Sequence, residues 1–125
     1  MTTEHDTRVR RVSKGMREEL AALLGGEVKD PGAAGAIVTR VELTNDLRSA
    51  RIFVRLLEGG DDPERRKKVL AALGRASGML RREVTQRLAL RAAPELRFAY
   101  DEGQDHTTRV EELLEEINKE QRKRK

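Results

Sequence analysis

The chain has 125 residues, of which 38% are charged and 37% hydrophobic, and its formal net charge is +4. It contains no cysteine, which excludes disulfide bonds, thiol nucleophiles and cysteine-ligated zinc sites. The first residues, MTTEHDT, form no apolar signal segment, and no apolar run reaches membrane-spanning length. We therefore expect a cytoplasmic protein with one compact domain.

The charges are separated along the chain rather than mixed. Residues 63–91 carry nine Lys or Arg side chains and two acids, whereas residues 95–117 carry eight acids and two arginines. The last eight residues are basic again, with five bases and one acid. Such separation within a small domain favours one face that binds a polyanion and another face that is turned away from it.

The N-terminal half predicts one helix and two strands. Apolar residues from Val9 to Leu24 recur every three or four positions, which predicts an amphipathic helix that ends at Gly25-Gly26. Arg10, Lys14 and Arg17 form a basic stripe on that helix. Residues 37–44 and 50–57 alternate between two faces and predict an antiparallel pair. In the first strand the alternation places these residues on one face: Ile37, Thr39, Val41 and Leu43.

The C-terminal half predicts more helix and a third strand. Asp62 and Pro63 suit a helix start, and the apolar stripe then continues to about Arg91. Gly74 and Gly78 each cost about 1 kcal/mol inside a helix, so we expect one helix to Gly74, a kink at 75–78 and a second helix that Ser77 caps. Residues 95–101 predict a strand. Residues 108–118 predict an amphipathic helix with a Thr108–Glu111 capping box.

Candidate RNA-binding residues gather around the predicted kink and on the first helix. A helix that starts after the kink would offer free N–H groups to a phosphate, and Gly78 would let a nucleic-acid backbone come close. With only three aromatic side chains in the protein, binding should depend on phosphate contacts and shape. The alternative is a glycine-rich helix corner with ordinary solvated arginines. The full candidate set is Arg10, Arg11, Lys14, Arg17, Arg65, Lys68, Arg75, Ala76, Ser77, Gly78, Arg81 and Arg82.

The sequence contains no pattern for catalysis or metal binding. Phosphate-binding loops, dinucleotide-binding glycines, zinc-protease helices and calcium loops are all missing. His5 and His106 lie in polar segments, and helix capping or a strand-exit turn explains Asp61-Asp62 and the DEGQD sequence. We expect a protein that is not an enzyme and that needs no cofactor and no metal.

The order helix–strand–strand–helix–kink–helix–strand is that of a type II KH domain, with Ala76-Ser77-Gly78 in the place of the GXXG loop. Over residues 8–117 the sequence resembles the ribosome-binding factor A family. After Asp30-Pro31, Gly32 stands where that family usually has arginine. The resemblance is carried by residues 8–12, 29–31, 38–47, 76–78, 88–91 and 94–96, together with Ala50, Leu80, Arg81, Phe98 and Asp101.

The resemblance implies an α+β fold of the type II KH kind, with a three-stranded sheet covered by helices on one face and a C-terminal helix. It predicts a flexible segment 1–7, an RNA-binding domain 8–101, a loop and amphipathic helix 102–118, and a disordered basic tail 119–125. It also implies a monomeric factor for cold adaptation. That factor binds the immature 30S subunit, through 16S rRNA and ribosomal proteins, and assists late maturation, including 5′-end processing of the rRNA.

Two other functions fit the same residues. One is a generic KH-type RNA-binding protein that acts on messenger or regulatory RNA. The other is an adaptor that recruits a protein through the acidic helix predicted at 108–118.

Overall fold

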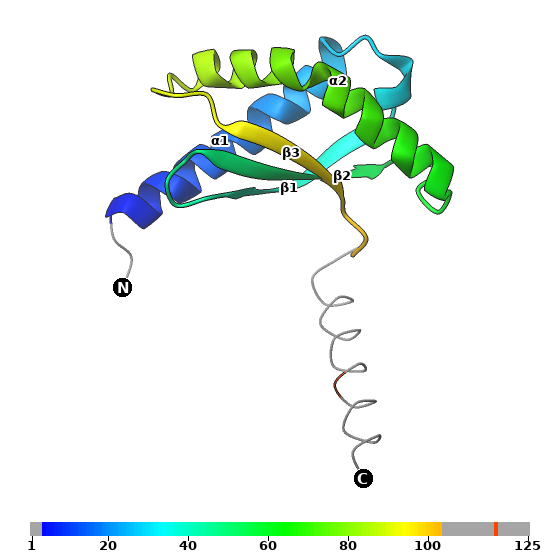
Figure 1. Ribbon diagram of the computed structural model, residues 1–125, viewed down its shortest axis with the longest axis horizontal. Coiled ribbons are helices and arrows are strands. Elements are labelled where there is room, and N and C mark those ends of the chain that lie inside the picture. The colour runs from blue at the N-terminus through cyan, green and yellow to red at the C-terminus, as the bar shows by residue number, and fades with distance from the viewer. Residues whose placement is uncertain (1–3, 104–116, 118–125) are drawn as a thin grey trace.

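The computed structural model describes residues 4–103 and residue 117 (Figure 1). Apart from Ile117, the helix predicted at 108–118 and the tail predicted at 119–125 lie outside the described residues. The elements, in chain order, are α1 (Glu4–Gly26), a short 3-10 helix η1 (Pro31–Ala33), β1 (Ala36–Leu43), β2 (Ser49–Leu56), α2 (Pro63–Arg87) and β3 (Glu95–Tyr100). Helix α1 begins at Glu4, five residues before Val9, where the apolar pattern predicted its start.

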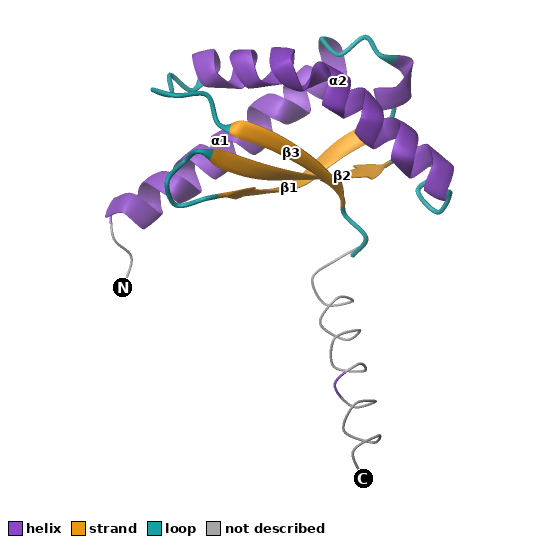
Figure 2. Cartoon of the chain, viewed as in Figure 1, coloured by secondary structure: helices purple, strands orange, loops and turns teal. Residues whose placement is uncertain are grey.

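The three strands form one mixed sheet in the order β1-β2-β3. Strands β1 and β2 pair antiparallel, as their alternating patterns predicted, and β3 pairs parallel to β2. A parallel pair needs a long crossover connection, which α2 supplies. Both long helices lie on the same side of the sheet (Figure 2). The predicted α+β class and the one-sided cover of the sheet are therefore confirmed.

A β-bulge in β1 overturns part of the predicted alternation. Val38 pairs with Val54 and Arg40 pairs with Phe53, so Thr39 is an extra residue without a partner in the register. The extra residue shifts every side chain after it to the opposite face. Ile37 therefore does not share a face with Val41 and Leu43, which pack against the core together with Val38. The Thr39 hydroxyl lies 2.6 Å from Oδ2 of Asp101, at the end of β3.

Helix α2 is one continuous helix, so the predicted break at 75–78 and the second helix after it are wrong. It starts as predicted, with Oδ1 of Asp62 accepting from the Glu64 N–H at 3.0 Å. Figure 1 shows α2 changing direction near its middle, so the glycines bend the helix without ending it. Ser77 does not cap a helix start, because its hydroxyl donates to the Gly74 carbonyl within the helix at 2.8 Å.

The core between the helices and the sheet is aliphatic. Fully buried large side chains come from three elements of the fold: Met16, Leu20 and Leu23 of α1, Ile52 and Val54 of β2, and Val69, Leu73, Leu80 and Val84 of α2. Burying each such side chain contributes roughly 1.5–3 kcal/mol. The helical spacing in α1 and α2 and the alternation in β2 therefore place their apolar residues as the sequence predicted.

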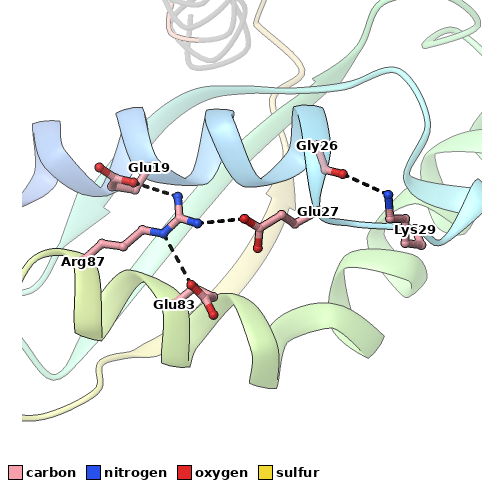
Figure 3. A network of polar contacts seen from close by, with 6 residues as sticks. All are labelled: Glu19, Gly26, Glu27, Lys29, Glu83 and Arg87. Atoms are coloured by element: carbon pink, nitrogen blue, oxygen red, sulfur yellow. Dashed lines mark hydrogen bonds and ion pairs between the residues drawn. The ribbon is translucent and has the colours of Figure 1, made fainter.

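Arg87 joins the end of α2 to α1. Its guanidinium lies 3.2 Å from Glu19, 2.9 Å from Glu27 and 3.4 Å from Glu83, and one side chain thus faces three carboxylates (Figure 3). The hydrogen bond that Arg87 donates to Glu19, followed by the charge of Glu27, raises the pKa of Arg87 above its ordinary value. Beside this cluster, Leu88 packs so closely on Gly15 that a Cβ there would lie 2.9 Å from it. The α1–α2 junction is therefore both charged and tightly packed.

Candidate nucleic-acid interface

The outer side of α2, away from the core, has a bare stretch of backbone at its middle. A Cβ placed on Gly74 would meet nothing within 4 Å, and one on Gly78 would meet only the Arg82 guanidinium, at 3.8 Å. Neither glycine is therefore needed for packing within the described residues. Because glycine has no side chain, a sugar–phosphate backbone can approach the helix closely here.

Lys68 and Arg82 are exposed cations on α2 on either side of this stretch along the helix. Within residues 4–103, neither side chain forms an ion pair or a hydrogen bond. An incoming phosphate would therefore displace only water from them. These two residues, with Gly74 and Gly78, form what we call the α2 outer face.

The Arg75 side chain forms an ion pair within the fold. Its Nε donates to Oδ2 of Asp30 at 2.8 Å, and Oδ1 of Asp30 accepts from the Gly32 N–H at 2.9 Å. The bond from Arg75, followed by that from Gly32, holds the pKa of Asp30 below its usual value. Arg75 therefore fastens η1 to α2. It is still exposed along much of its length, so it adds positive charge near the α2 outer face.

Arg81 and Arg65 also contact other parts of the chain. The Nη2 and Nε atoms of Arg81 donate to the Ala93 carbonyl at 2.7 and 3.2 Å, which ties α2 to the segment before β3. Arg65 lies over Gly59, whose φ of 78° places it in the left-handed region. The predicted set of cations therefore contains both free and engaged side chains.

The predicted phosphate site at a helix N-terminus is absent. Arg81 and Arg82 lie inside α2, where the backbone N–H groups are already used in helical hydrogen bonds. A phosphate at this surface would have to bind side chains and not backbone amides. Ala76 and Ser77 are half-buried, with Ala76 packed against the core. Of the predicted Ala76-Ser77-Gly78 motif, only Gly78 lies on the outer face.

The basic stripe on α1 does not join the α2 outer face. Gly15 and Glu19 contact the C-terminal end of α2 and so mark the side of α1 that faces it. At about 100° per residue, the stripe of Arg10, Lys14 and Arg17 lies roughly 150° around the helix from that side. Arg11 lies closer to the α2 side. The structure thus splits the predicted surface into two.

The close packing around residue 32 explains why glycine stands where the family usually has arginine. A Cβ on Gly32 would lie 3.1 Å from the Cβ of Ala72 and 3.4 Å from the Lys68 carbonyl. Glycine thus allows η1 to pack directly on α2, next to the Asp30–Arg75 pair. The loop at 29–35 is part of the wall beside the α2 outer face.

Sequence reasoning missed three further arginines. Arg8, Arg48 and Arg91 come from α1, the β1–β2 turn and the α2–β3 connection, and they line one pocket. No local pattern brings them together, because only the folded chain places the three segments around one pocket. One sequence feature could have identified two of them as candidates, because Arg8 and Arg91 lie in segments that carry the family resemblance.

The described part of the chain shows no group of His, Cys, Asp or Glu side chains able to hold a metal ion. None of its helices is both long enough and apolar enough to cross a membrane. Exposed arginines and lysines, several of them without an ion pair, remain as the candidate binding groups of the described surface. The fold is that of a KH-like α+β domain.

The chain belongs to the ribosome-binding factor A family, whose family model matches residues 8–114. It is 48% identical to "Ribosome-binding factor A" of Sorangium cellulosum over 110 residues, which cover 88% of each chain. It is 39% identical to the protein of the same name from Desulforamulus reducens over 116 residues, covering 93% of this chain and 94% of the relative. The predicted resemblance, and the prediction that the protein is not an enzyme, are confirmed by this membership.

Solved structures of the same family share the fold. The crystal structure of ribosome-binding factor A from Thermus thermophilus matches 74% of this chain and 94% of its own, with a TM-score of 0.63 and 22% identity. A solution structure from Thermotoga maritima, described as a putative ribosome binding factor A, matches 78% and 86%, with a TM-score of 0.57 and 32% identity. A model of the Thermus protein fitted into a map of a 30S–RbfA complex matches 73% and 88%, with a TM-score of 0.52 and 24% identity.

Proposed function

We propose that this protein binds the immature 30S subunit in the cytoplasm and assists its late maturation, with the α2 outer face against 16S rRNA. The observation that carries the proposal is the bare backbone at Gly74 and Gly78 beside the unpaired cations Lys68 and Arg82. Family membership and the 30S–RbfA complex described for the Thermus protein support it.

The binding energy comes mainly from phosphates. Exposed Lys and Arg side chains release counterions when they neutralise a phosphate, so the affinity falls as salt rises. The α1 stripe of Arg10, Lys14 and Arg17 supplies a second group of such side chains on a separate surface. If about four to six cations of the two surfaces contact rRNA, the log–log salt slope is roughly −3 to −5.

The test is co-sedimentation of the full chain with purified immature and mature small subunits over a series of salt concentrations. Reversing the charges in a Lys68→Glu/Arg82→Glu variant should weaken binding strongly and flatten the salt slope by about 2. Arg75 and Arg81 are left unchanged, because their reversal would also break contacts that hold the fold.

Arg51→Glu/Arg97→Glu is the matched control. Both residues are exposed on the sheet face opposite to the helices, since their neighbours Ala50, Ile52 and Leu96 point into the core. Equal binding of the wild type and the α2 variant would refute the proposed face. Binding to unrelated RNA with the same affinity as to small subunits would favour the generic RNA-binding function.

A separate experiment tests whether the protein assists maturation of the 16S rRNA. Adding the protein to immature subunits in a cell extract that supplies the processing nucleases should increase the fraction of 16S rRNA with a mature 5′ end, measured by primer extension. The Lys68→Glu/Arg82→Glu variant should not produce this increase, whereas the control variant should.

A further inference from the structure

A pocket of about 230 Å³ lies where α1, the β1–β2 turn and the α2–β3 connection meet. Figure 1 shows these three segments together at the end of the molecule where α1 begins. The walls of the pocket are mainly aliphatic side chains from all three segments: Val12, Leu43, Leu47, Leu90 and Pro94. The volume is below the roughly 300 Å³ at which clefts for drug-sized ligands begin, so it suits one flat ring system.

Three arginines, one acid and Ala92 complete the lining. Arg8, Arg48 and Arg91 come from three different segments, and none of their side chains has an ion pair or a hydrogen bond within residues 4–103. The acid is Asp46, whose Oδ1 accepts from the Thr44 hydroxyl at 2.7 Å and from the Arg48 N–H at 3.0 Å. These two bonds, the hydroxyl first, hold the pKa of Asp46 below its ordinary value. The pocket therefore combines an apolar interior with a positive rim and one ionised acceptor.

The backbone around the pocket is strained. Leu47 has a φ of 61° and Ala89 a φ of 51°, and these are the two non-glycine residues with positive φ in the described part of the chain. Leu47 lines the pocket, and Ala89 directly precedes Leu90, which also lines it. Such conformations are energetically unfavourable for non-glycine residues and concentrate at functional sites. Both strained residues are thus at the same pocket, although they come from different loops.

We infer that this pocket receives one unstacked base of a single-stranded rRNA segment, while Arg8, Arg48 and Arg91 hold the flanking phosphates. This inference rests on the proposed function and names a contact outside the α2 outer face. RNA loops and ends are recognised through bases that leave the stack, because the bases inside a helix are hidden. A nucleotide supplies both the planar apolar group for the interior and the anion for the rim. An apolar protein side chain would bring no charge to the three arginines.

Arg81 links the pocket to α2. Its bond to the Ala93 carbonyl holds the segment between the lining residues Ala92 and Pro94. A base in the pocket and phosphates on α2 would therefore be bound by one rigidly connected surface. This contact gives Arg81 a positioning role rather than the direct phosphate contact expected from the sequence.

The experiment uses a short single-stranded RNA with 2-aminopurine at its centre and the full chain. Binding of the wild type should raise the 2-aminopurine fluorescence, because the base leaves its stacked neighbours. Ala92→Phe places a ring at the pocket from an exposed position and should abolish the rise and weaken affinity roughly tenfold. Ala22→Phe is the matched control, at an exposed position of α1 outside the pocket lining.

A second variant, Arg48→Ala/Arg91→Ala, tests the rim without filling the interior. It should weaken RNA binding and reduce the salt slope by about 2. Unchanged melting temperatures for both variants would show that the fold is intact. An unchanged fluorescence rise in Ala92→Phe would overturn the inference.

Two further outcomes separate the inference from the proposed function. If Ala92→Phe leaves the RNA signal unchanged but loses small-subunit binding, the occupant is a protein segment and the inference is wrong. If the wild type shows the pocket-dependent RNA signal but does not co-sediment with small subunits, the proposed function is wrong and base capture stands.

Discussion

Arg82 and Arg87 lie five residues apart on α2, but only Arg87 forms ion pairs within the described residues. Arg87 faces three carboxylates, from Glu19, Glu27 and Glu83, at 2.9 to 3.4 Å. Arg82 is exposed and has no ion pair or hydrogen bond within residues 4–103. A phosphate that approached Arg87 would compete with three acids already in place, whereas at Arg82 it would displace water alone.

The net charge of a segment therefore overestimates the number of cations that are free to bind RNA phosphates. Residues 63–91 contain nine Lys or Arg side chains. Several of them bind other parts of the chain: Arg66 binds Gly60 and Glu102, Arg75 binds Asp30, Arg81 binds Ala93 and Arg87 binds three glutamates. A cation is available for binding only if the fold leaves it without an acid or a carbonyl, and position in the sequence does not show this.

The largest expected effect concerns the inner side of α2. Ala76 is half-buried and packs against the core, so Ala76→Leu should overpack it and lower the free energy of unfolding by about 1–3 kcal/mol. Urea unfolding of the wild type and the variant measures the difference. Equal stability would mean that position 76 belongs, with Arg82, to the open side of the helix.

On the α2 outer face, a larger side chain should stabilise the fold instead of destabilising it. Gly78→Ala adds a methyl group in open space and should raise the free energy of unfolding by about 0.5–1 kcal/mol, because alanine is the better helix former. If RNA uses the bare backbone, the same variant should bind small subunits more weakly. Gly25→Ala, also in open space at the end of α1, is the control and should leave binding unchanged. A stabilised Gly78→Ala variant with full binding would show that close backbone approach is not needed.

The Arg82 and Arg87 comparison can be tested directly with a pair of substitutions. Arg87→Met leaves three carboxylates close together without a cation and should lower the melting temperature. Arg82→Met should leave the melting temperature unchanged and weaken small-subunit binding instead, because it removes only a free charge. Thermal unfolding and co-sedimentation of the two variants provide the readouts. If the two variants exchange these effects, the assignment of engaged and free arginines is wrong.

The smallest expected effect is the pH dependence of the Arg75–Asp30 contact. The pKa of Asp30 is lowered in the folded protein, so the contact stabilises the fold above the ordinary value of 3.8 and is lost as the pH falls through the lower folded value. Arg75→Met removes the largest cause of the shift. The stability difference between wild type and variant should be full at neutral pH and shrink below pH 3.8, as measured by urea unfolding. A difference that stays constant into this acid range would argue against the ion pair.

Periodicity alone was enough for most of the secondary structure and the core. The apolar spacing of α1 and the alternation of β2 predicted their buried residues, since a helix or strand with one apolar face has one way to cover it. Two features differ from the prediction, the bulge in β1 and the continuous α2 helix, and the apolar pattern does not indicate the cause of either. The bulge at Thr39 leaves no mark in the alternation, and the cost of Gly74 and Gly78 was overcome by packing of Leu73 and Leu80 on the other side of the same helix.

The sequence by itself therefore determined the family, the fold class and the list of cations, because these depend on residue types and their order. Only the tertiary structure decided which cations are free, because an ion pair such as Arg75–Asp30 joins residues that are 45 positions apart. It also separated the α1 stripe from the α2 outer face. For the same reason, the meeting of Arg8, Arg48 and Arg91 at one pocket is a property of the folded chain, since three segments must close before the pocket exists.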